Sequence, residues 1–173
     1  HTISRRQRQM CIRDRAYPLT KKNLFTALAK KIPHEGQLVD NFYERWKEID
    51  STLPDIEISV YGPPPTSGTR DAFVELVMLS ACLDDDVYVA AYTDKKQRSH
   101  ACAMLREDGK YIEAGENDNL MIQKLSKNSE SLGILGYSFL DQNRSALQGH
   151  SVNGVSPFLS LIHISEPTRR TII

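Results

Sequence analysis

The stretch that decides the fold is VYGPPPTSGTRDAFVELVM, which runs from Val60 to Met78. The segment that leads into it, Ile56–Val60, alternates apolar and polar residues and predicts a strand. Pro63–Pro65 then interrupt that pattern. A helix is predicted from Thr69 onward, because apolar residues recur there at helical spacing. These residues are Phe73, Val74, Val77 and Met78.

The segments before and after this stretch also alternate between helical and strand patterns. Thr20 is expected to cap an earlier helix. Short strands are expected at 110–115 and 131–140, with a helix at 116–128 between them. This alternation predicts a layered α/β domain. The residues expected to face the core from the two helices are Leu24, Phe25, Leu28, Ile32, Leu120, Met121 and Leu125.

The two ends of the chain differ in character from the rest. Residues 1–15 and 159–173 resemble translated adapter and mosaic-end DNA of transposon-based sequencing libraries. Codons for Met10–Asp14, taken on the opposite strand, can encode Leu159–Ile164, and unrelated protein segments would seldom be reverse complements. We therefore expect both ends to be adapter-like scars and residues 16–158 to be the domain, a gene fragment open at both ends. A basic arm that binds nucleic acid is the alternative interpretation.

The charge balance argues against nucleic acid and membrane partners. The whole chain carries 22 basic and 22 acidic side chains. Without the seven arginines and two acids of the adapter-like ends, 15 basic and 20 acidic side chains remain, a net charge of −5. The sequence contains no apolar run near the roughly 20 residues that span a bilayer, so membrane insertion is not expected.

Cysteines and histidines give little sign of a metal or cofactor. Cys82 and Cys102 lie 20 residues apart, which allows either a disulfide or two buried thiols. The sequence has no CxxC pair, and His34, His100 and His150 lack metal-ligand spacing. It also has no P-loop and no G-x-G-x-x-G. Neither a metal nor a cofactor is expected.

The start of the helix after the prolines has the composition of an oxyanion site. Ser67 and Thr69 supply hydroxyl groups, and Gly68 lets the backbone approach a ligand closely. Arg70 adds a fork of donors that suits an oxyanion, next to the free N–H groups of the first helical turn. Pro63–Pro65 stiffen the approach. Ordinary helix capping explains the same residues without a ligand.

A second helix start lies at Ala114–Asn119. Its polar residues are expected to be capping residues. Asn117 and Asn119 are also candidates for a secondary contact at a ligand cleft.

Five stretches of the sequence carry a resemblance to a known family, and they are LTKKNLFTALAKKIP, ERWKEIDSTLPDIEISVYGPPPTSGTRDAFVELVM, REDGKYIEAGENDNLMIQKL, LGILGYSFLDQN and LQGHSVNGVSP. Taken together, they resemble the periplasmic phosphate-binding proteins of bacterial phosphate ABC transporters. The resemblance covers nearly all of Ala16–Phe158, and it implies most of the second lobe of a type II periplasmic binding protein, an α/β fold with a mixed sheet flanked by helices. It also implies inorganic phosphate as ligand in an interlobe cleft, permease subunits as partners, a periplasmic location and no enzymatic activity.

The resemblance assigns phosphate binding to the Ser-Gly-Thr motif, here Ser67, Gly68 and Thr69. An arginine joins them in the family. In some members it stands four residues before the serine, where this chain has Pro63, and in others it follows the threonine, as Arg70 does here. The first-lobe ligands of the family have no counterpart in this sequence.

Two alternatives remain open. A related binding protein could take molybdate, tungstate or sulfate instead of phosphate. A hydrolase could use Ser67 as nucleophile, which requires a nearby base. The sequence has no histidine within thirty residues of Ser67.

Overall fold

The computed structural model describes residues 17–115 and 117–155. The adapter-like ends predicted at 1–15 and 159–173 lie outside these residues. Within the described part of the chain, no helix is long and apolar enough to cross a membrane.

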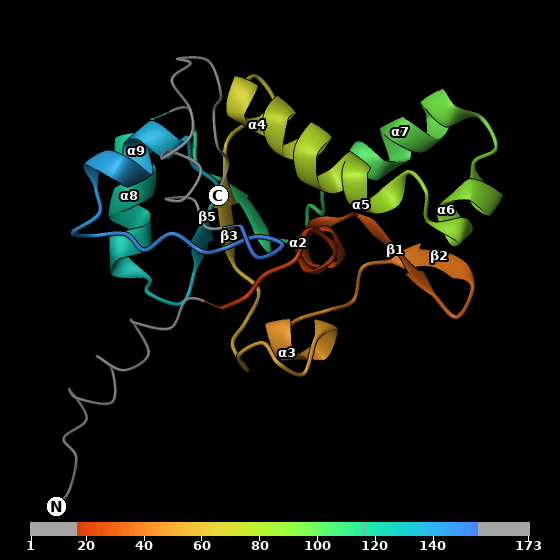
Figure 1. The fold of residues 1–173 in the computed structure, drawn as a ribbon, viewed down its shortest axis with the longest axis horizontal. Coiled ribbons are helices and arrows are strands. Elements are labelled where there is room, and N and C mark those ends of the chain that lie inside the picture. The colour runs from red at the N-terminus through yellow and green to blue at the C-terminus, as the bar shows by residue number, and fades with distance from the viewer. Residues whose placement is uncertain (1–16, 116, 156–173) are drawn as a thin grey trace, which may run out of the picture.

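A parallel sheet lies at the centre of the fold, and helices flank it (Figure 1). Its strands have the order β4-β3-β5, with Val60 opposite both Tyr111 and Leu132. This arrangement confirms the predicted α/β class. The sheet is parallel rather than mixed, because the antiparallel strands form a separate hairpin, β1-β2. The strands are β1 (Lys31–His34), β2 (Gln37–Asp40), β3 (Val60–Gly62), β4 (Tyr111–Glu113) and β5 (Leu132–Gly133).

Helix α2 (Lys21–Leu28) begins at the predicted cap. Thr20 and Asn23 form a capping box, in which each side chain accepts the other residue's backbone N–H. The helix ends before Ile32, which was predicted to lie on its apolar face and instead belongs to β1. Pro33 disfavours helical geometry at the residue before it, and Ile32 still reaches the core from the strand, with 1% of its surface exposed.

A continuous helical run follows β3. It comprises α4 (Gly68–Phe73), a π-helical turn η1 (Val74–Leu79) and α5 (Ser80–Cys82). Phe73, Val77 and Met78 are buried on one face, as the sequence predicts, and Val74 is half-buried beside them. Both α2 and α7 pack against η1.

Two more helices follow α5, namely α6 (Asp86–Ala91) and α7 (Lys95–Ala103). A disulfide links α7 to α5. Cys82 of α5 and Cys102 of α7 form a disulfide with Cα atoms 5.8 Å apart, and both residues are fully buried. Of the two arrangements that the sequence allows, the structure therefore has the disulfide.

The last two helices described, α8 and α9, lie on the opposite side of the central strands from α4 and α5 in Figure 1. Helix α8 (Asp118–Lys127) buries Met121 completely, but Leu120, also predicted to face inward, is 48% exposed. The strand predicted at 131–140 is limited to β5, because Gly136 starts helix α9 (Tyr137–Gln142). A short helix, α3 (Trp46–Ile49), carries the buried Trp46.

Candidate functional site

The turn between β3 and α4 carries the predicted anion site. Ser67 is the N-cap residue of α4, and its Oγ accepts the backbone N–H of Thr69 at 3.2 Å. The backbone N–H of Ser67 donates to the carbonyl of Pro64 at 3.0 Å. These bonds give Ser67 a capping role whether or not a ligand binds.

The start of α4 also has backbone donors that no described residue accepts. Among the described residues, the backbone N–H groups of Gly68 and Arg70 have no hydrogen-bond acceptor. Gly68 is exposed, and Ser67 and Thr69 are half-buried. Free amides at a helix start point outward along the helix axis and favour an anion. The turn can therefore donate to a small anion from solvent.

Arg70 folds back against the turn. Its side chain is only 14% exposed. Its Nη1 donates to the carbonyl of Pro63 at 3.2 Å and to the hydroxyl of Tyr111 at 3.1 Å. The guanidinium carbon lies 5.0 Å from the centre of the Tyr111 ring, within cation–π range. The positive charge thus sits beside residue 63, the position at which the sequence resemblance places arginine in other family members.

Two residues of β4 complete this cluster, and sequence reasoning missed both. Tyr111 is buried, and its hydroxyl donates to the carbonyl of Pro63 at 2.8 Å. Burial raises the pKa of Tyr111, so the hydroxyl stays protonated and remains a donor. Glu113 lies with Oε1 3.7 Å from Nη1 of Arg70 and is about half exposed. Tyr111 is 41 residues from Arg70, and only the parallel pairing of β3 with β4 brings them together.

The second predicted helix start serves as a cap. The side-chain oxygen of Asn117 accepts the backbone N–H groups of Asn119 at 3.0 Å and Leu120 at 3.4 Å. Asn119 is exposed. Since α8 follows β4 and α4 follows β3, both helices begin at the carboxyl edge of the same parallel sheet, where ligands bind in open α/β folds. A secondary cleft contact by Asn117 and Asn119 stays a prediction.

Comparisons with known proteins find relatives in sequence and in fold. No family model matches the chain. The phosphate-binding protein PstS of Staphylococcus haemolyticus is 29% identical over 127 residues, which cover 73% of this chain and 30% of that protein. The chain matches a segment of PstS-like phosphate-binding proteins. It therefore spans about 30% of the length of this curated PstS relative.

Two solved structures share the fold of this chain. PstS from Borrelia burgdorferi has a TM-score of 0.55 and 20% identity, and the match covers 84% of this chain and 46% of that one. A "possible phosphate binding protein" from Planctomyces limnophilus has a TM-score of 0.54 and 21% identity, covering 81% of this chain and 38% of the other. At these identities the likeness concerns the fold alone, and it agrees with the predicted α/β class. That residues 16–158 form a single lobe stays a prediction.

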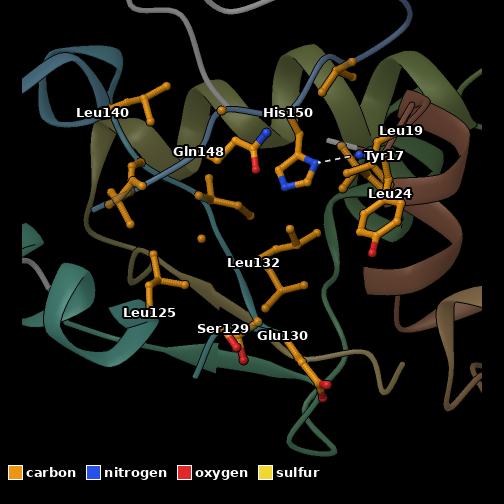
Figure 2. Close-up of a pocket in the computed structure, with 18 of the residues that line it drawn as sticks. Tyr17, Leu19, Leu24, Leu125, Ser129, Glu130, Leu132, Leu140, Gln148 and His150 are labelled. Atoms are coloured by element: carbon orange, nitrogen blue, oxygen red, sulfur yellow. Dashed lines mark hydrogen bonds between the residues drawn. The ribbon is translucent and has the colours of Figure 1, made fainter. Parts of the chain in front are cut away.

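A cavity lies beside β5, away from the turn between β3 and α4. It has a volume of about 820 Å³, and its walls are mainly apolar side chains. Figure 2 shows Leu125, Leu132 and Leu140 around it, together with His150, whose Nδ1 accepts the backbone N–H of Tyr17 at 3.2 Å. None of the residues Ser67–Arg70 lines this cavity. Its lining also includes polar side chains, among them Ser131, Arg144 and Gln148.

A shallower hollow of about 460 Å³ borders Arg70 on the side of α7. Asp71 and Glu75 line it together with apolar residues. Two carboxylates would repel an anion there. The donors around Ser67–Arg70 therefore stay the predicted anion site, although neither hollow is centred on them.

Proposed function

We propose that this chain is part of the solute-binding component of a phosphate ABC importer. In this proposal Ser67, Gly68, Thr69 and Arg70 bind inorganic phosphate in a cleft between two lobes, and this chain supplies most of the second lobe. The observation that carries it is the half-buried Arg70 guanidinium beside a helix start whose first amides have no acceptor among residues 17–115 and 117–155. The chain is also similar to proteins named phosphate-binding.

The physical case rests on donors that are already in place. The helix start contributes backbone N–H groups and a partial positive charge, and Arg70 contributes a full one. Pro63–Pro65 limit the motion of the turn, so little freedom is lost when an anion binds. The complete protein would then deliver phosphate to permease subunits from the periplasm, and it would carry out no chemistry of its own.

Other oxyanions are the main alternative, because molybdate, tungstate and sulfate would fit the same donors. The enzyme hypothesis is weaker. A nucleophilic serine needs a base that accepts its proton, and in the described part of the chain Ser67 Oγ bonds only to a backbone N–H. The relatives are named as binding proteins, which favours binding over hydrolysis.

The direct test is a phosphate titration of the 173-residue chain, followed by ¹H–¹⁵N NMR at constant ionic strength. We expect a dissociation constant no tighter than roughly millimolar, about −4 kcal/mol, because only one lobe surrounds the anion. The largest shifts should occur at the amides of Gly68, Thr69 and Arg70. The amides of Leu38 and Val39, in the hairpin β1-β2, serve as an internal control. Shifts confined to the large cavity would contradict the site.

Arg70→Lys tests the contribution of the guanidinium. A point charge cannot reproduce a two-pronged contact, so binding should weaken severalfold. Arg45→Lys is the matched control, since Arg45 is an exposed arginine of another ion pair, with Asp55. Equal binding by parent and Arg70→Lys would show that Arg70 does not hold the anion. A parallel titration with sulfate compares the two oxyanions, and micromolar binding by this chain would refute the two-lobe account.

A further inference from the structure

Three backbone and side-chain groups meet beneath the proline turn. The Tyr111 hydroxyl donates a hydrogen bond to the carbonyl of Pro63 and accepts one from Nη1 of Arg70. The same Nη1 also donates to the Pro63 carbonyl. Turn, tyrosine and arginine thus form a closed triangle of hydrogen bonds, in which each group fixes the other two.

Gly62 makes this approach of the tyrosine possible. A Cβ atom at residue 62 would overlap the hydroxyl oxygen and ring carbons of Tyr111. The ring therefore fills the space that a side chain of β3 would otherwise occupy. Since an aromatic ring is rigid and Tyr111 is only 6% exposed, the position of its hydroxyl is closely determined.

The triangle uses only part of the arginine. Among the described residues, Nε and Nη2 of Arg70 have no hydrogen-bond partner, and Nη1 is the nitrogen held by Pro63 and Tyr111. One edge of the guanidinium is thus anchored while other donors stay available. Glu113 also lies near Nη1, but it is half exposed, and an exposed ion pair fixes a long side chain poorly.

We infer that Tyr111 is a positioning residue for the anion site, holding the Pro63 turn and the Arg70 guanidinium in place before a ligand arrives. This inference rests on the proposed function of the Ser67–Arg70 turn. Its physical basis is preorganisation, because a free arginine loses side-chain freedom on binding and an anchored one has already lost it. Tyr111 itself does not need to touch the anion.

The test is Tyr111→Phe in the 173-residue chain, titrated with inorganic phosphate by NMR. Phenylalanine keeps the ring and removes only the hydroxyl, so the turn loses its anchor without a new cavity. We expect phosphate to bind about fivefold more weakly, the worth of one hydrogen bond. We expect the Arg70 Nε–H signal to be sharp in the parent and to broaden in the variant through faster exchange with water.

Tyr88→Phe is the matched control. Tyr88 is also buried, and its hydroxyl donates to the carbonyl of Lys31 at 2.7 Å in the hairpin. It should lose comparable stability and keep the parent's phosphate binding. In the Arg70→Lys background, Tyr111→Phe should have little further effect, because the group that it positions is already gone.

The outcomes separate the inference from the function on which it rests. Parent-like binding and an unchanged Arg70 Nε–H signal in Tyr111→Phe would overturn the positioning role and leave the anion site standing. Equal weakening in Tyr88→Phe would also overturn it, since a general loss of stability would then explain the effect. A parent chain that shows no shift at Gly68–Arg70 with phosphate would overturn both.

Discussion

The turn after β3 and the cavity beside β5 lie along the same sheet, but different interactions stabilise them. At the turn, hydrogen bonds from Tyr111 and Arg70 converge on one carbonyl, that of Pro63. The cavity is far larger, about 820 Å³, and is bounded mainly by apolar side chains. The Tyr17 amide and Nδ1 of His150 form one hydrogen bond at its wall.

This difference shows why volume is a poor guide to an anion site. A small anion needs convergent donors at fixed positions, and an apolar wall cannot replace the water that it loses. The turn provides such donors without a deep hollow. In a chain that spans about 30% of the length of a curated relative, the partner surface for either region can belong to the rest of the protein.

The largest expected effect is on the free energy of unfolding, and it comes from replacing one glycine in each region by alanine. Gly62→Ala forces a Cβ into the rigid ring of Tyr111, and we expect a loss of about 1–3 kcal/mol in the free energy of unfolding. Gly133→Ala instead meets Cδ1 of Leu125, a flexible side chain that borders the cavity and can move into it. Its cost should be clearly smaller.

Urea unfolding of both variants measures this contrast. Gly62→Ala should also disturb the Arg70 Nε–H signal, whereas Gly133→Ala should not. If the two substitutions cost the same, the turn is no more rigid than the cavity wall, and the comparison between the two regions fails.

A smaller effect separates capping from binding at Ser67. Ser67→Ala should cost about 1 kcal/mol of stability, while Ser67→Gly should cost only a few tenths, because glycine is tolerated at an N-cap. Both variants lack the hydroxyl, so in the complete protein both should bind phosphate more weakly by about 1–3 kcal/mol.

Thr69→Ala should weaken phosphate binding in the same way, and calorimetric titration measures all three variants. Phosphate affinity that is unchanged in every one of them would mean that the motif only caps α4. Recovery of affinity in Ser67→Gly alone would mean that Ser67 acts through helix stability.

The smallest expected effect is the change of stability with pH that His150, at the cavity wall, contributes. Burial lowers the pKa of His150 below its usual 6.5, so the unfolded chain binds a proton more readily than the folded one. The stability contributed by neutral His150 is present above 6.5 and is lost as the pH falls below that value. Protonation also removes the acceptor for the Tyr17 N–H, a bond worth about 0.5–1.5 kcal/mol.

Thermal unfolding between about pH 5 and pH 8 measures this loss, which shifts the midpoint by a few degrees per kcal/mol. His150→Gln should flatten the dependence. His34→Gln removes an exposed imidazole and is the control. If the midpoint of His150→Gln still falls steeply as the pH is lowered, other groups cause the pH response and His150 does not.

Local sequence signals predicted the parts of the fold that depend on neighbouring residues. The cap at Thr20 and the buried face of Phe73, Val77 and Met78 agree with the structure because capping and helical periodicity act over a few residues. Ile32 and Leu120 were misassigned. Their positions depend on where a helix ends and which side of it meets the core, and neighbouring elements decide both.

By itself, the sequence determined the α/β class and the composition of the turn Ser67–Arg70, because both follow from patterns within short segments. Which of two thiol arrangements Cys82 and Cys102 adopt was decided only when α5 packed beside α7. The same holds for Tyr111 beneath Arg70. Residues 41 apart meet only because β3 and β4 pair in parallel, and such pairing depends on the whole sheet rather than on either segment.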